Sequence, residues 1–143
     1  MMPLHRSLAR TLSVAALVAA AGCTASESYL AAPEASRLLA GTWAEDTTVP
    51  GVSFVLSLTT RDTLVSGTGT YAIEAGRSGT LSVTGTVTGS RVTLNIVYDY
   101  GPVSYFEGAP PTSSGLAGAM KNGPKDSMVP SVAVSFHRTQ GLD

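Results

Sequence analysis

From residue 41 to residue 139, short segments of the chain alternate between apolar and polar side chains with a period of two. This period places successive side chains on opposite faces of an extended backbone, so it predicts β-strands with one buried face. The segment 80–88 is the clearest case, because leucine and valine alternate there with serine and threonine. Charged residues make up only 13% of the chain, which also favours strands and turns over exposed helices.

Eight segments of this kind can be delimited. They are residues 41–47, 52–60, 63–74, 80–88, 91–100, 103–108, 115–121 and 132–139. The connections between them are short and rich in glycine, proline and aspartate, which are turn-forming residues. The one longer connection is 122–130, which contains two prolines and a glycine.

Short connections between consecutive strands predict an antiparallel meander. Eight such strands, each with one apolar face, bury those faces best by closing on themselves, which also removes exposed strand edges. The predicted fold is therefore all-β, an antiparallel up-and-down eight-stranded barrel. A seven-stranded sandwich is the alternative.

The first 22 residues have the parts of an export signal. Arg6 and Arg10 form a basic start without acidic residues, and a short apolar stretch follows from Leu12 to Ala21. This stretch is shorter than the roughly 20 residues that a permanent membrane helix needs. Residues 1–22 are therefore predicted to be a signal peptide.

The sequence Ala20-Ala21-Gly22-Cys23 resembles the lipobox of bacterial lipoproteins. The resemblance implies that Cys23 receives a diacylglyceryl group, that cleavage precedes it and that its new amino terminus is acylated with a fatty acid such as palmitate. It implies a lipid-anchored protein of the cell envelope, and Thr24 after the cysteine favours the outer membrane in a diderm organism. Ordinary cleavage after Ala21, which leaves a free thiol, is the alternative. A single cysteine excludes an internal disulfide.

Residues 23–37 carry small and polar side chains around Pro33 and are predicted to be the lipidated N-terminus and a flexible tether, with a helical turn over 34–39. The barrel domain is then residues 38–143. Without Arg6 and Arg10 the chain has seven basic and ten acidic side chains, a formal charge of about −3. This balance excludes a basic nucleic-acid-binding surface.

The tripeptide Gly41-Thr42-Trp43 opens the first strand. It resembles the Gly-x-Trp signature at the start of the barrel in lipocalins, avidins and related calycins. In those families the tryptophan closes one barrel end and packs against a basic residue near the end of the last strand. Here Arg138 has that place, so the resemblance implies barrel closure by Gly41, Trp43 and Arg138.

Residues that could carry catalysis are few. His137 alternates with Phe136 and is expected to point outward, and Glu45 and Asp46 are adjacent, so a strand places them on opposite faces. The signatures of common hydrolases and zinc sites do not occur. Glycines in the run 67–70 are predicted to let a strand bend around a small barrel. The expectation is a protein that is not an enzyme, with no metal and no cofactor.

An eight-stranded barrel is wide enough either to fill with side chains or to hold one small ligand. Five side chains on the predicted inner faces are candidates to line such a site: Phe54, Tyr71, Leu94, Ile96 and Tyr98. The first hypothesis is therefore a lipoprotein that binds a small hydrophobic ligand. The second is a packed-core structural or interaction lipoprotein that binds an envelope protein through the loops 122–130 or 107–114, and inhibition of that partner is one form of this hypothesis.

Overall fold

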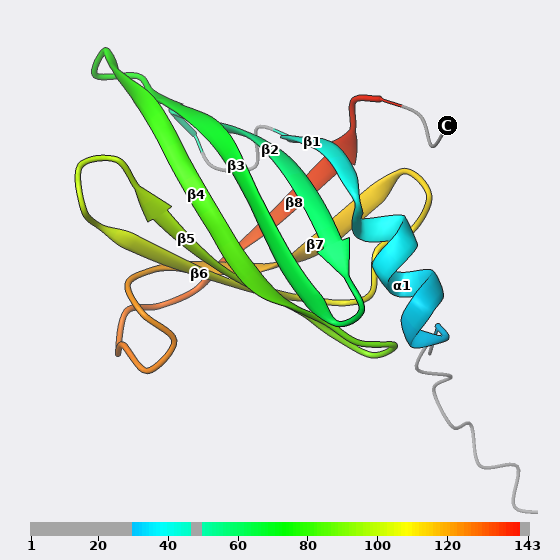
Figure 1. The fold of residues 1–143 in the computed structure, drawn as a ribbon. Coiled ribbons are helices and arrows are strands. Elements are labelled where there is room, and N and C mark those ends of the chain that lie inside the picture. Colours follow the sequence, from blue (N-terminus) through cyan, green and yellow to red (C-terminus); the bar gives the residue numbers. More distant parts are fainter. Residues whose placement is uncertain (1–29, 47–49, 141–143) are drawn as a thin grey trace, which may run out of the picture.

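Eight consecutive strands close into a barrel in the computed structural model, which describes residues 30–46 and 50–140 (Figure 1). One helix precedes them. The elements are α1 (Ala32–Leu39), β1 (Gly41–Glu45), β2 (Val52–Arg61), β3 (Leu64–Ile73), β4 (Arg77–Val87), β5 (Val92–Tyr98), β6 (Val103–Gly108), β7 (Gly115–Asn122) and β8 (Val132–Arg138). The predicted signal peptide, Cys23 and the first part of the tether lie outside the described residues.

Each strand pairs with its neighbour in the sequence, and every pairing is antiparallel. The barrel is closed by antiparallel pairing of β1 with β8, in which Trp43 lies opposite Arg138 and Glu45 lies opposite Phe136. The predicted all-β, up-and-down, eight-stranded barrel is therefore confirmed, and the sandwich is excluded. A closed barrel leaves no unpaired edge strand.

The boundaries of β4 and β5 differ from those expected from the sequence. β4 begins at Arg77 instead of residue 80, because its first residues pair with the end of β3 from Ile73 onward. β5 ends at Tyr98, and Asp99 lies in the following turn. Gly76 before β4 has a φ of 79°, a left-handed conformation that glycine adopts without strain.

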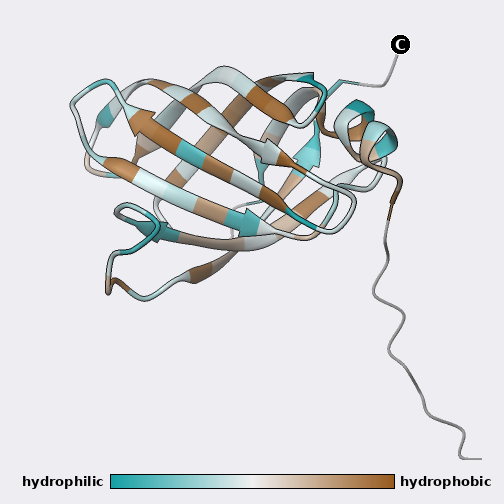
Figure 2. Ribbon diagram, turned by 60° about the horizontal axis from the view of Figure 1, so that its bottom comes forward, coloured by the Kyte–Doolittle hydropathy of each residue, from teal (hydrophilic) through white to brown (hydrophobic). Residues whose placement is uncertain are grey.

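The interior of the barrel is filled by the apolar side chains of the alternating pattern. Figure 2 shows hydrophobic and hydrophilic residues alternating along the strands. The largest fully buried side chains include Trp43, Phe106, Phe136, Leu56 and Leu94. Burying a side chain of this size contributes about 1.5–3 kcal/mol, so this interior is the main source of stability.

Helix α1 lies across one end of the barrel (Figure 1). It begins at Ala32, two residues before the expected turn, because Pro33 in its first turn suits the helix start. The helix's own side chains Ala35, Leu38 and Leu39 are buried. The hydroxyl of Thr60 donates to the carbonyl of Ser36 at 3.0 Å, so this helix is attached to β2. Residues 32–37, expected in the tether, are thus helical.

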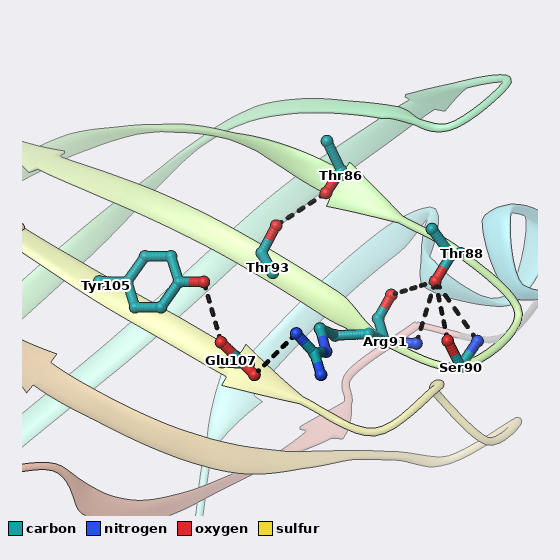
Figure 3. A network of polar contacts seen from close by, with 7 residues as sticks. All are labelled: Thr86, Thr88, Ser90, Arg91, Thr93, Tyr105 and Glu107. Atoms are coloured by element: carbon teal, nitrogen blue, oxygen red, sulfur yellow. Dashed lines mark hydrogen bonds and ion pairs between the residues drawn. The ribbon is translucent and has the colours of Figure 1, made fainter. Parts of the chain in front are cut away.

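Polar side chains link β4, β5 and β6 on the outside of the barrel (Figure 3). The hydroxyls of Thr86 and Thr93 are 2.8 Å apart. Arg91 forms an ion pair with Glu107 at 3.3 Å, and the hydroxyl of Tyr105 donates to Glu107 at 3.0 Å. Burial, and then the contact with Glu107, raises the pKa of Tyr105. Both partners of the ion pair are exposed, so it contributes at most about 1 kcal/mol.

Candidate functional site

The barrel end beneath α1 is closed by the residues that the Gly-x-Trp resemblance singled out. The guanidinium of Arg138 lies 4.4 Å from the centre of the Trp43 ring. Its Nη1 donates to the carbonyl of Ala40 at 2.8 Å, and its Nη2 donates to the carbonyl of Leu38. The indole N–H of Trp43 donates to the carbonyl of Leu39 at 2.9 Å. These contacts satisfy carbonyls that the end of a helix leaves without partners.

Gly41 is needed at this closed end for a steric reason. Its φ is 136°, and a β-carbon at this position would lie 2.3 Å from Nη1 of Arg138. A side chain would therefore displace the guanidinium from its carbonyl partners. Gly41, Trp43 and Arg138 form one structural unit that joins α1, β1 and β8.

The opposite end of the barrel carries a cluster of aromatic rings. Tyr71 and Tyr98 are in edge contact, with ring centres 5.2 Å apart, and the rings of Phe54 and Tyr98 are 6.3 Å apart. Tyr100 lies 5.7 Å from both tyrosines and is 47% exposed. We call Phe54, Tyr71, Tyr98 and Tyr100 the aromatic mouth. The turns after β3 and β5 lie at this end, far from α1 (Figure 1).

Tyr71 is fixed at the rim of the aromatic mouth by a carboxylate. Its hydroxyl donates to Oδ1 of Asp99 at 2.8 Å, and the backbone N–H of Thr80 donates to Oδ2 of Asp99 at 3.0 Å. Burial, and then the contact with Asp99, raises the pKa of Tyr71 to about 12. The hydrogen bonds from Thr80 and Tyr71 hold the pKa of Asp99 below its usual value. At neutral pH this pair is therefore a phenol that donates to a carboxylate.

Tyr98 begins a chain of polar contacts across three strands, which runs from buried Ser104 to exposed Asn122. Its hydroxyl lies 3.0 Å from Oγ of Ser104 on β6, which donates to Oδ1 of Asn122 on β7 at 3.2 Å. Ser104 has no exposed surface. Burial raises the pKa of Tyr98. The sequence analysis identified Tyr98 but missed its two partners, since their contact depends on the register of strands β5 to β7.

Leu94 and Ile96, the other two candidate lining residues, lie below the aromatic mouth. Both have no exposed surface, and both belong to the same buried cluster as Phe54, Tyr71 and Tyr98. Ile96 pairs with Ser104 across the β5–β6 ladder. The five candidates therefore face the interior together, with the aromatic side chains near the end and the aliphatic ones deeper.

A carboxylate that the sequence analysis did not assign to the site also faces the interior. Glu45 is 7% exposed, whereas its neighbour Asp46 accepts hydrogen bonds on the outer surface. The predicted placement of these two residues on opposite faces is therefore confirmed. The alternation with buried Trp43, two residues earlier, is the sequence signal that could have placed Glu45 inside.

Asp46 connects β1 to β8 on the outside of the closure. One of its oxygens lies 2.5 Å from Nδ1 of His137, and the other accepts from the hydroxyl of Ser135 at 2.7 Å. The side chain of His137 is 55% exposed, as expected for an outward position. Serine and histidine both contact the carboxylate rather than each other, which is not the order of a catalytic triad. The contacts with Ser135 and then His137 lower the pKa of Asp46.

We expect Asp46→Asn to lower the free energy of unfolding at neutral pH by about 0.5–1 kcal/mol, because partly exposed pairs contribute this much. The pKa of Asp46 in the folded protein lies below the ordinary value of 3.8. The stabilisation that its carboxylate contributes is therefore fully present above pH 3.8 and is lost as the pH falls through the lower folded pKa. Urea unfolding at a series of pH values measures this. Asp62→Asn is the control, and a wild-type advantage that persists unchanged at acid pH would contradict the assignment.

Taken together, the closed end and the aromatic mouth define a closed antiparallel barrel whose architecture is compatible with a lipocalin-like fold. No model of a known protein family matches the sequence, and no curated protein is detectably similar to it. Within residues 30–46 and 50–140, no group of three or more histidine, cysteine, aspartate or glutamate side chains is arranged to hold a metal. In the same residues, no helix has the length and apolar character to cross a membrane.

Proposed function

We propose that this chain is an envelope lipoprotein with a lipocalin-like barrel, anchored through Cys23, that binds a small hydrophobic molecule at the aromatic mouth. The observation that carries the ligand proposal is the set of polar groups buried among aromatic rings, namely Glu45, Ser104 and the hydroxyl of Tyr98. Small-molecule sites combine apolar walls with a few polar groups in this way. A purely structural barrel would gain more stability from apolar side chains at those positions.

In this proposal the rings of Phe54, Tyr71 and Tyr98 contact the ligand, and Leu94 and Ile96 form the floor beneath it. The hydroxyl of Tyr98 has Ser104 as an internal partner, so a ligand that inserts beside it can exchange one hydrogen bond for another. The protein acts by binding and uses no cofactor. An eight-stranded barrel is wide enough for at most one small ligand, which sets the size class.

Native mass spectrometry tests the ligand proposal directly. The mature chain with Cys23→Ser is expressed in a bacterial periplasm and purified without detergent. We expect an additional stoichiometric mass that disappears under denaturing conditions, and this mass identifies the ligand class. A bare protein mass, together with no binding of a neutral hydrophobic fluorophore, would contradict the proposal.

Tyr98→Ala is expected to weaken binding of the same ligand by about 10-fold or more, because it removes both a ring of the mouth and a hydroxyl. Tyr98→Phe retains the ring and is expected to retain most of the affinity. Fluorophore titration measures both variants, and circular dichroism checks that they fold. The control is Leu64→Ala, since Leu64 is 63% exposed on β3. Equal affinity of Tyr98→Ala and wild type would exclude this site.

Anchoring through Cys23 is tested by expressing the full chain in a host that processes lipoproteins. We expect the chain to sediment with the membranes and to have a mass increased by acyl chains, since two or more chains hold a protein stably at a bilayer. Cys23→Ser is expected to remain in the soluble fraction. An unmodified Cys23 in the processed protein would instead indicate ordinary signal cleavage.

A protein partner is the second candidate function, and one observation favours it. The loop between β7 and β8 exposes Met128 at 98% and Val129 at 45%. The amino group of Lys121 donates to the carbonyls of Lys125 and Ser127, so the loop holds this apolar tip outward. We expect Met128→Ser to abolish capture of such a partner without changing ligand binding at the mouth. The loop after β6 is a weaker candidate, because the carbonyl of Ser113 accepts from Arg138 at the closed end.

A further inference from the structure

The described part of the chain begins beside the closed end of the barrel. The backbone N–H of Leu30 donates to the carbonyl of Gly89 at 3.0 Å, in the turn between β4 and β5. A β-carbon on Gly89 would lie 2.1 Å from the carbonyl oxygen of Leu30, so this close approach requires glycine. Helix α1 then crosses the same end (Figure 1). The segment that leads back to Cys23 is therefore attached at the end opposite the aromatic mouth.

The segment between Cys23 and Leu30 is short compared with the barrel. It comprises seven Cα-to-Cα steps, which span at most about 25 Å when fully extended. β2 has ten residues, and a strand of this length that is tilted by about 40° extends about 25 Å along the barrel axis. An anchor at Cys23 therefore keeps the closed end near the bilayer, whereas the mouth reaches the bilayer only if the segment is drawn out along the whole barrel.

Exposed arginine side chains lie at the closed end. Arg37 on α1 and Arg61 at the end of β2 are exposed, and neither forms an ion pair within the described residues. Burial, and then the charge of Arg37, lowers the pKa of Arg138, so these two cations are neighbours. Leu64 pairs with Arg61 across the β2–β3 ladder and is 63% exposed. Cations that lack carboxylate partners, beside an exposed leucine, suit a surface of anionic lipid headgroups over acyl chains.

The charges of the two halves of the barrel differ in sign. The half that carries α1 has four arginines and three carboxylates, and one of these carboxylates, Glu107, already pairs with Arg91. In the half that carries the mouth, three basic side chains are outnumbered by four exposed carboxylates: Asp46, Glu74, Asp99 and Asp126. A negatively charged bilayer attracts the first half and repels the second, so charge and attachment favour the same orientation.

We propose that the closed end docks on an anionic bilayer through α1 and the β2–β3 turn, with Arg37 and Arg61 on lipid phosphates and Leu64 at the acyl boundary. The aromatic mouth then opens away from the membrane that holds the anchor, so a ligand enters it from the aqueous side and not laterally from the bilayer. This inference rests on the proposed anchoring through Cys23 and adds the orientation of the barrel on the membrane.

The test measures how close each end of the acylated protein lies to the bilayer. Because acylation occupies the sulfur of Cys23, an introduced cysteine supplies the free thiol that carries a donor dye. Thr63→Cys places the dye in the β2–β3 turn, and Met128→Cys places it in the loop after β7; both positions are exposed. The proteins are reconstituted into vesicles of phosphatidylcholine and phosphatidylglycerol that contain an acceptor dye on a lipid headgroup. We expect energy transfer from position 63 to be about three-fold or more as efficient as from position 128, because the barrel separates the two by about 25 Å.

The role of the headgroups is tested by removing either charge. Vesicles of phosphatidylcholine alone, or Arg37→Glu in the original vesicles, should lower the transfer from position 63 by about two-fold or more, since each basic side chain near an anionic surface contributes to the attraction. Raised salt should act in the same direction. The matched control is Lys125→Glu, which reverses one exposed charge in the other half of the barrel and is expected to leave the transfer unchanged. If Arg37→Glu does not fold, the comparison of the two lipid compositions still decides the proposal.

The outcomes separate this inference from the anchoring on which it rests. Equal transfer from the two positions, or stronger transfer from position 128, overturns the docking while the anchor stands. Transfer from position 63 that depends on neither phosphatidylglycerol nor Arg37 also overturns the docking, because attachment alone then explains the orientation. If the intact mass shows no acyl chains on Cys23, anchoring and docking are both overturned.

Discussion

Trp43→Ala is expected to lower the free energy of unfolding by about 3–5 kcal/mol, the range for truncation of a large buried aromatic residue. The side chain of Trp43 has no exposed surface, and its indole donates to the end of α1. Its loss leaves a cavity, removes this hydrogen bond and leaves Arg138 without the ring beneath its guanidinium. The effect should therefore exceed that of removing an aliphatic side chain of the core.

Urea denaturation followed by far-ultraviolet circular dichroism measures this loss. Leu64→Ala, at an exposed position on β3, is expected to change stability by no more than about 0.5 kcal/mol. A double-mutant cycle with Arg138→Gln tests the contact itself: Arg138→Gln should cost less in the Trp43→Ala background than in the wild type. Additive effects would show that the two side chains do not stabilise each other.

The second large effect is expected from Gly69→Ala, a change of one methyl group in the middle of β3. A β-carbon there would lie 2.2 Å from the carbonyl oxygen of Val55 and 2.9 Å from a methyl group of Leu81. The first of these atoms belongs to the backbone of β2, so the strands must separate. We expect a loss of about 1–3 kcal/mol, although alanine is otherwise favoured over glycine within strands.

Gly115→Ala is the matched control for this change, because it also adds a methyl group to a strand glycine. Its nearest neighbour would be the hydroxyl of Thr112 at 3.4 Å, an ordinary contact. In both thermal and urea unfolding, the free energy of unfolding of Gly69→Ala should therefore be lower than that of Gly115→Ala by more than about 1 kcal/mol. Equal stabilities would mean that the close approach of β2 and β3 does not depend on Gly69.

The strands of this barrel could be predicted from the sequence because their alternation is regular. The start of β4 could not, since Gly79 made residues 76–79 resemble a turn. The structure explains this glycine: a β-carbon there would lie 2.3 Å from Oδ2 of Asp99, a residue in the turn after β5. Glycine is needed at position 79 because two segments that are distant in the sequence approach each other there. Local sequence patterns do not contain this information.

In the candidate site, too, the features that depend on local patterns could be predicted, and those that depend on contacts between distant segments could not. Tyr71 and Tyr98 could be placed on inner faces by their period alone, whereas the partnership of Trp43 with Arg138 was implied by the resemblance to the Gly-x-Trp signature. The chain from Tyr98 to Ser104 and Asn122 requires the register of three strands. Glu45 was not assigned to the site because charged side chains usually face solvent, although its period of two with Trp43 points it toward the interior, where it is buried.

The seam between β1 and β8 is the shortest ladder of the barrel within the described residues, with three paired positions compared with ten between β2 and β3. Thermal fluctuations that open a closed sheet start where the fewest hydrogen bonds must break. An opened seam exposes two strand edges, and such edges promote domain swapping and fibril formation. The contacts of the Asp46 carboxylate with Ser135 and His137 join the two strands of this seam on the outer surface. They therefore protect the protein against self-association as well as unfolding.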